Sequence, residues 1–306
     1  MGAMTITYGV IVHGGAWNIP DEAVDDHRRG VAAALGKAHA LLAAGGAALD
    51  AVEIAVALME DDPTFDAGRG AFVNSAGEVE LDAIIAVSDR RLGAVCAVQN
   101  IRNPIRLARR VMEKTPHVML AGKGANLFAR EEGIAECRPE DLLVGRELER
   151  YHAIRNMSSF EPKDAFRKPQ GMGTVGCVSL DKSGRIAIGV STGGTPHKRS
   201  GRVGDTPIFG CGGYVEEMGG AAATGFGEDI IRILMTRQAI DYLKQGHDPM
   251  KAASQAVDDL GKVGGLGGVI LLCRQGYGLA FNTPRMAFAL RIEDSPAVVG
   301  IEPKDC

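Results

Sequence analysis

Residues 173–194 read GTVGCVSLDKSGRIAIGVSTGG, two strand-like segments joined by a short polar turn. Apolar side chains recur at about every second position over residues 174–180 and 185–191, which is the period of a β-strand. The connecting Asp181-Lys182-Ser183-Gly184 has the chemistry of a tight hairpin turn. The sequence therefore predicts an antiparallel hairpin whose first strand begins at Thr174.

The segment in front of this hairpin has a different character. Residues 156–173 are polar, contain Pro162, Pro169 and Gly171, and show almost no periodicity. Such a composition is typical of a linker, and we expect 156–173 to be mobile. A flexible segment would then end, and a buried strand begin, at the pair Gly173-Thr174.

The rest of the chain alternates between helical and strand patterns. Residues 5–12 read as a strand that ends in a turn at His13-Gly14-Gly15, and the glycine-dense residues 193–227 give no clear pattern. The expected helices cover 21–44, 49–59, 103–114, 228–245 and 248–260, with a weaker signal over 139–155, and Asn103 is the expected cap of its helix. Further strands are expected at 79–85, 94–98, 268–273, 276–282 and 286–292. Tight hairpins and clustered helices predict an α/β (α+β) chain with largely antiparallel sheets covered by helices.

Composition narrows the class of protein. Lys plus Arg number 34 against 38 Asp plus Glu, a net charge of −4, which argues against a nucleic-acid binder. The longest apolar runs fall far short of the roughly 18 residues of a membrane span, and no signal peptide is recognisable, so we expect a cytoplasmic protein that binds no membrane. The six cysteines show no metal-ligand spacing and are expected to be reduced. Residues 1–3 look like a cloning remnant before a natural start at Met4.

Two motif matches are set aside on their context. Residues 171–176 fit G-x-G-x-x-G, but that dinucleotide loop must follow a strand and open a helix, whereas here a polar segment precedes and a strand follows. Residues 189–193 fit the G-x-S-x-G nucleophile elbow, which must also enter a helix. The following Gly194-Thr195-Pro196 does not favour one.

The position of Thr174 suggests chemistry. A threonine that merely starts a strand is one interpretation; the other is a nucleophile exposed by cleavage after Gly173. A hydroxyl needs a base, and the α-amine of a new N-terminal residue supplies one, with a reference pKa of about 7.7–8.0. Gly173 would let the backbone adopt the shape in which the hydroxyl attacks the preceding carbonyl.

Over essentially its whole length the chain resembles the plant-type L-asparaginase/isoaspartyl peptidase family of N-terminal nucleophile hydrolases. The segments that carry the resemblance are, in chain order, HGGA (13–16), DPTFDAG (62–68), GEVELDA (77–83), NPI (103–105), VMEKTPH (111–117), GTVG (173–176), STGG (191–194), GRVGD (201–205) and ATGFGE (223–228). Four of the later motifs occur in order beside the segment where the family is cut.

The resemblance implies a four-layer αββα sandwich and a single domain over 4–306 that cleaves itself into an α chain, 4–173, and a β chain, 174–306. Two such αβ units would form a dimer, a heterotetramer of chains. It also implies site roles: nucleophile and base Thr174, its partner Thr192, a carboxylate clamp Arg202, an ammonium acceptor Asp205, an oxyanion hole of Thr224 and Gly225, and pocket-lining Gly225 and Gly227. Gly14 and Gly15 would lie near this site. A sodium ion would be held by the backbone carbonyls of Met59, Glu60, Asp62, Phe65, Ala67 and Arg69; no organic cofactor is expected.

Two features of the residues bear on these implied roles. Arg202 and Asp205 stand three apart in a glycine-bracketed turn, a spacing that suits a substrate carrying both an α-carboxylate and an α-amine, although a surface ion pair has the same signature. Asp66 stands where the family commonly has Asn. We expect Asp66 to turn away from the site and pair with Arg69; protonation by burial, or an oxyanion hole that does without it, are the alternatives.

The expected activity is therefore hydrolysis of β-aspartyl dipeptides and L-asparagine through an acyl-enzyme on Thr174. Two other functions stay open: a glycosylasparaginase-like amidase, and an uncleaved homologue that only binds. The first typically has Asp before the nucleophile, where this chain has Gly173; the second predicts loss of a motif threonine, and Thr174, Thr192 and Thr224 are all present.

Overall fold

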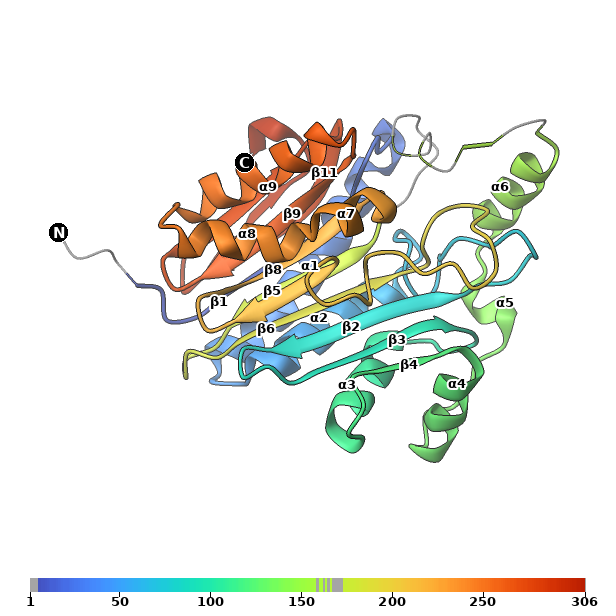
Figure 1. The fold of residues 1–306 in the computed structure, drawn as a ribbon, viewed down its shortest axis with the longest axis horizontal. Helices are drawn as coiled ribbons and strands as arrows, with labels where there is room; N and C mark the ends of the chain where they lie inside the picture. The colour runs from blue at the N-terminus through green and yellow to red at the C-terminus, as the bar shows by residue number, and fades with distance from the viewer. Residues whose placement is uncertain (1–4, 158–159, 162, 164–165, 167–172, 306) are drawn as a thin grey trace.

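The computed structural model describes residues 5–157, 160–161, 163, 166 and 173–305. Two β-sheets face each other between two layers of helices (Figure 1). Apolar side chains form three clusters: α1 and α2 against the larger sheet, the two sheets against each other, and the smaller sheet against α8 and α9. The αββα sandwich expected from the sequence is confirmed. The expected remnant at 1–3, and 158–159, 162, 164–165 and 167–172 of the expected linker, lie outside the described residues.

The larger sheet has the strand order β12-β11-β1-β5-β6-β2-β3-β4 and the smaller one β10-β9-β8-β7. Every neighbouring pair is antiparallel except β3 and β4. The strands of the larger sheet are β1 (Gly9–Trp17), β2 (Leu81–Val87), β3 (Leu92–Val98), β4 (Met119–Ala121), β5 (Val175–Leu180), β6 (Ile186–Thr192), β11 (Arg285–Ile292) and β12 (Val298–Gly300). Those of the smaller sheet are β7 (Gly213–Glu216), β8 (Gly219–Gly225), β9 (Gly267–Cys273) and β10 (Gly276–Phe281).

The helices lie on the two outer faces and at one end of the sandwich (Figure 1). They are η1 (Asp21–Ala23), α1 (Val24–Ala43), α2 (Ala48–Asp61), α3 (Pro104–Lys114), α4 (Gly122–Glu131), α5 (Pro139–Leu142), α6 (Gly145–Arg155), α7 (Gly227–Ile233), α8 (Met235–Lys244), α9 (Pro249–Lys262) and η3 (Pro303–Asp305). Among the described helices, none is long and apolar enough to cross a membrane. The cysteines that the structure describes are all free, as expected.

The predicted hairpin is the centre of the larger sheet. β5 pairs with β6 from Val175–Ser191 to Leu180–Ile186, and both strands are buried along their whole length. β1 hydrogen-bonds to β5 on the other side, and β2 to β6. In this sheet β1, from before residue 173, lies between β11 and β5, and β6 is paired with β2. These hydrogen bonds would hold the two parts together if the chain were cut at residue 173.

The glycine-rich segments differ from the expectation in two places. The strand at the N-terminus does not turn at His13-Gly14-Gly15 but continues to Trp17, with a bulge between His13 and Ala16. The stretch 193–227, which gave no clear pattern, contains β7 and β8. Small residues hide β8 from a propensity-based prediction, because Gly and Ala are depleted in strands generally.

Several helix expectations also needed correction. The helix expected at 228–245 is broken at Leu234, whose φ of 52° is left-handed, and the one expected at 139–155 is split into α5 and α6. Asn103 does not cap α3 with its side chain; its amide nitrogen donates instead to the Ala57 carbonyl, 3.3 Å away, and ties α3 to α2.

Candidate active site

Thr174 lies directly before β5, in the interior of the sandwich. It is 8% exposed, and its hydroxyl donates to the Thr192 hydroxyl at an Oγ1–Oγ1 distance of 3.0 Å. Thr192 is the last residue of β6, and the hairpin register, with Val175 opposite Ser191, sets the two threonines beside each other. The structure thus brings together the two residues that the sequence paired at the ends of one hairpin.

Thr192 stands at the centre of a hydrogen-bond chain. Its oxygen accepts from the Gly194 amide at 2.9 Å as well as from Thr174, so its own proton is left to donate to Asp66 Oδ2, 3.3 Å away. The other Asp66 oxygen accepts from the Phe72 amide at 2.9 Å. Because the Thr192 proton is used for Asp66, the Thr192 oxygen can only accept from the Thr174 hydroxyl. These hydrogen bonds therefore fix the direction in which the Thr174 hydroxyl donates.

The expected pairing of Asp66 with Arg69 is wrong. Asp66 is fully buried and turns toward Thr192, whereas Arg69 is exposed. Burial raises the pKa of Asp66 to about 8, so the side chain is protonated at neutral pH. The site accommodates it closely, since a Cβ on Gly193 would lie only 2.3 Å from Asp66 Oδ1. Burial favours protonation, one of the two alternatives, whereas both carboxyl oxygens accept hydrogen bonds here, one from the Phe72 amide and one from the Thr192 hydroxyl.

The bulge in β1 brings backbone against the bond before Thr174. Gly15 has a φ of +101°, and a Cβ there would lie 2.3 Å from the Gly173 Cα, so only glycine fits at this position. Gly14 is just as tightly packed, against the Phe65 ring. His13 is buried with its ring against Gly176, and burial lowers its pKa to about 3, so it is neutral.

Thr224 and Gly225 end β8 on the opposite side of this centre. Thr224 is fully buried, and its hydroxyl accepts from the Ala16 amide at 3.3 Å, which ties β8 to the bulge of β1. Gly225 has a φ of +148°, and a Cβ would lie 2.3 Å from the Leu266 carbonyl oxygen. The strand that carries both residues was missed from the sequence, although the motif at 223–228 marked their position.

Asp205 is buried and Arg202 is half-buried, so they are not a surface pair. The Arg202 guanidinium makes a two-point bond with Glu228, at 2.9 and 2.7 Å, while Asp205 Oδ2 has no partner among the described residues. Burial raises the pKa of Asp205 to about 7. Both groups converge on Gly227, where a Cβ would lie 2.7 Å from Asp205 Oδ1 and 3.0 Å from Arg202 Nη2. A cation and an anion therefore face the same small space.

Lys198 is a buried charge that the sequence reasoning missed. It is 3% exposed, its ammonium donates to the Glu80 carbonyl at 2.8 Å, and burial lowers its pKa. A Cβ on Gly194 would lie 3.1 Å from Lys198 Nζ and 3.2 Å from Arg202 Nη1, so both cationic groups pack against Gly194. A lysine between His197 and Arg199, in a polar loop, carries no sequence signal of burial.

The loop after α2 contains the carbonyls expected to bind sodium. The Glu60 carbonyl accepts from the Arg69 amide at 2.7 Å, and that of Asp62 from the Phe65 amide at 3.3 Å. Each carbonyl oxygen keeps a second lone pair, so these contacts are compatible with a cation. In the described part of the chain no group of three or more His, Cys, Asp or Glu side chains could hold a metal.

A four-layer sandwich whose central strand directly follows a buried threonine with a hydroxyl partner is the arrangement of the N-terminal nucleophile hydrolases. The sequence profile described as Asparaginase matches residues 6–301, and the chain belongs to this family. It is 41% identical to the isoaspartyl peptidase/L-asparaginase of Xenopus laevis over 297 residues, 95% of this chain and 94% of that protein. The proteins of the same name from Danio rerio (42% over 287 residues, 92% and 91%) and Homo sapiens (39% over 300 residues, 97% and 96%) are similarly close.

Proposed function

We propose that this protein is a threonine amidohydrolase that cleaves itself between Gly173 and Thr174 and then hydrolyses β-aspartyl dipeptides and L-asparagine. One observation carries the proposal: a buried threonine directly before a central strand, with its hydroxyl 3.0 Å from the Thr192 hydroxyl and the Gly15 backbone against Gly173. The names of the relatives, isoaspartyl peptidase/L-asparaginase, support it.

Self-cleavage would use the Thr174 hydroxyl on its own preceding carbonyl. Attack by Oγ1 on the Gly173 carbon moves the acyl group from nitrogen to oxygen, and water then hydrolyses the ester. The step needs a backbone that can bend at the scissile bond, and Gly173 together with the bulge at Gly15 provides one without side-chain obstruction. The product carries a free α-amine on Thr174.

Substrate hydrolysis would reuse the same hydroxyl with the new amine as base. The Thr174 oxygen attacks the side-chain carbonyl of the aspartyl group, and its proton passes to the amine and on to the leaving nitrogen. Thr224 and the Gly225 amide, at the end of β8, would stabilise the oxyanion, a role for which one donor typically contributes about 3–4 kcal/mol. Water then releases aspartate from the ester.

The substrate would be held by its free α-groups. Arg202, whose Nε and Nη2 bind Glu228, would offer Nη1 to the α-carboxylate, and Asp205, whose Oδ2 has no partner in the described chain, would accept the α-ammonium. Gly227 leaves the space between them open. A peptide linked through the α-carboxyl has no free carboxylate to present, which would restrict the enzyme to β-linked substrates.

The remaining expectations are part of the same proposal. The α and β chains would stay associated through the strands that alternate in the larger sheet, and two αβ units would form a dimer. The carbonyl loop at 59–69 would hold a structural sodium ion, which supplies no chemistry and braces the chain before Asp66. Free buried thiols support a reducing, cytoplasmic location.

The test is direct. Purified protein is incubated with L-asparagine, β-aspartyl-leucine and α-aspartyl-leucine, and free aspartate is measured. We expect release from the first two and none from the third. Thr174→Ala is the inactive comparison, and Thr174→Ser is the matched control because it keeps a hydroxyl. Release from the α-linked peptide at a comparable rate would contradict the proposed specificity.

A further inference from the structure

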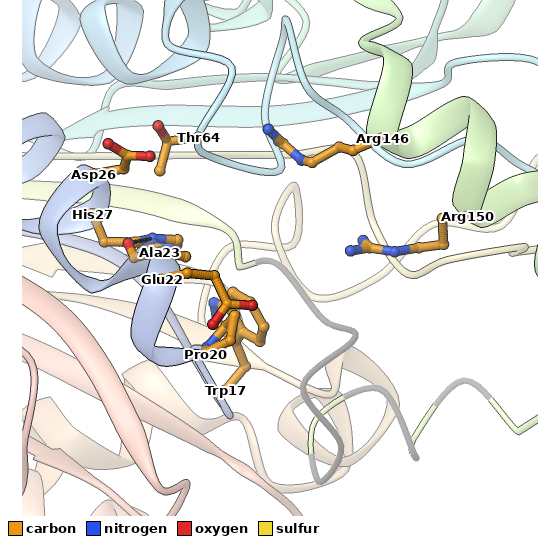
Figure 2. Close-up of a pocket in the computed structure, with 9 residues that line it drawn as sticks. All are labelled: Trp17, Pro20, Glu22, Ala23, Asp26, His27, Thr64, Arg146 and Arg150. Atoms are coloured by element: carbon orange, nitrogen blue, oxygen red, sulfur yellow. Dashed lines mark hydrogen bonds between the residues drawn. The ribbon is translucent and has the colours of Figure 1, made fainter.

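A cavity of about 300 Å³ lies between the start of α1 and helix α6, and none of the site residues described above lines it (Figure 2). Figure 2 shows the side chains of Arg146 and Arg150 reaching into it from α6, with His27 and Glu22 on the opposite side. Its volume is at the lower end of the range for ligand pockets, which suits an occupant the size of one amino-acid residue.

The cavity lies next to the catalytic centre. Trp17, in its wall, is two residues beyond Gly15, the glycine that lies against Gly173. Thr64, also in the wall, is two residues before Asp66, the partner of Thr192. Arg150, in the same wall, also interacts electrostatically with Asp66, so the cavity borders the residue that binds Thr192. Neither the cavity nor its wall includes the Arg202 and Asp205 clamp.

Two buried polar atoms in the wall have no hydrogen-bond partner among the residues that the structure describes. Trp17 is 3% exposed and its indole N–H is unpaired; His27 is 2% exposed and its Nε2 is unpaired. His27 Nδ1 donates to the Ala23 carbonyl at 2.8 Å, and burial lowers the ring's pKa, so Nε2 of the neutral ring is an acceptor. Buried donors and acceptors are nearly always satisfied in native proteins, which points to an occupant that both donates and accepts.

Arg150 gives the cavity a cationic end. Its guanidinium lies over the Phe72 ring, 5.1 Å from the ring centroid, and its side chain is 19% exposed. Nη1 forms an ion pair with Glu147 Oε2 at 3.1 Å. The Phe72 amide donates to Asp66, so the same residue packs under Arg150 and supports the catalytic centre. An arginine of this kind binds a carboxylate in preference to a neutral group.

We propose that this cavity binds the leaving half of a β-aspartyl dipeptide, an α-amino-acid residue with a free carboxylate. Arg150 takes the carboxylate, Trp17 lies against the residue's side chain, and the orphaned indole N–H and His27 Nε2 gain partners. L-Asparagine releases only ammonia and leaves the cavity empty. This inference rests on the proposed function and adds a site that determines the preference for dipeptides over asparagine.

The test compares three substrates on the same enzyme: β-aspartyl-leucine, β-aspartyl-leucine amide, which lacks the carboxylate, and L-asparagine. We expect Arg150→Gln to raise KM for β-aspartyl-leucine at least tenfold and to change KM for the amide and for asparagine less than threefold. Trp17→Phe, which removes an N–H without a hydrogen-bond partner, is expected to raise KM for both dipeptides and not for asparagine. Arg155→Gln, an exposed arginine on the same helix, is the matched control.

Asparagine turnover in each preparation shows that the variant is folded, so a dipeptide-specific loss supports the site. An equal loss with all three substrates would show that Arg150 acts only on the fold, and no loss with either variant would show that the cavity holds only water; both results overturn the inference. Failure of the parent enzyme on asparagine as well would instead refute the proposed function.

Discussion

Replacing Asp66 by Asn removes a buried acid while keeping its shape. The pKa of Asp66 is raised from 3.8 in the unfolded chain to about 8 by burial, so between these two pH values the folded chain binds one proton more than the unfolded chain. Stability from this residue is therefore fully present below pH 4 and is lost as the pH rises toward 8. At about 1.4 kcal/mol per pH unit, the ceiling on this loss is about 6 kcal/mol.

Asn does not titrate, so we expect Asp66→Asn to unfold like the parent near pH 4 and to become progressively more stable than it up to pH 8. The assay is urea unfolding at pH 5, 6, 7 and 8, with Thr174→Ala present in both proteins so that each unfolds as one chain. Asp205 and Glu60, whose pKa values are also raised, titrate equally in both proteins and cancel.

A stability difference that stays flat with pH, or that favours the parent at pH 8, would refute this reasoning, because Asp66 would then be ionised and paired in the folded chain. In the otherwise unaltered enzyme the amide keeps the bond to Phe72 and reverses the one to Thr192, which then donates to Thr174. Two bonds change direction, the one between residue 66 and Thr192 and the one between Thr192 and Thr174, and none is lost, so we expect kcat within about tenfold of the parent, or about 1.4 kcal/mol.

Three further predictions concern the centre itself. Thr174→Ala is expected to abolish both self-cleavage and hydrolysis, since one hydroxyl serves both; an intact-mass measurement that finds normal processing would exclude Thr174 as the nucleophile. Arg202→Lys is expected to raise KM for L-asparagine at least tenfold in steady-state kinetics, because a point charge cannot replace a fork; an unchanged KM would remove Arg202 from the clamp. Because Asp205, with a pKa of about 7, must be ionised to accept an ammonium, we expect kcat/KM for L-asparagine to fall more steeply below pH 7 than for succinamate, which has no α-ammonium; equal slopes would show that Asp205 does not read this group.

Much of the fold follows from local patterns. The 174–191 hairpin has alternating apolar residues and a polar turn, and the structure places both strands within a residue of the expected ends. β8 could not be found in this way, because its Gly and Ala residues give no strand signal; it forms because small side chains fit between the two sheets and against α8. The bulge at Gly15 was read as a turn, since local sequence does not show that β11 and β5 continue the ladder on both sides.

Sequence motifs predicted which threonines form the site, but they did not predict the contacts that depend on burial. Thr174 and Thr192 lie at the two ends of a predicted hairpin, so their contact follows from register. The orientation of Asp66 depends on the desolvated space around Gly193, and the bond between Arg202 and Glu228 on how α7 begins; neither is encoded in nearby residues. Sequence proximity to Arg69 was therefore a poor guide to the partner of Asp66.

The most direct test of the central claim is the intact mass of the purified protein, taken alone and after quenching during turnover of L-asparagine. We predict two fragments, one ending at Gly173 and one beginning at Thr174, with a β-aspartyl ester found only on the second. A single uncut chain that still releases aspartate, or an ester on the fragment that ends at Gly173, would contradict Thr174 as the N-terminal nucleophile.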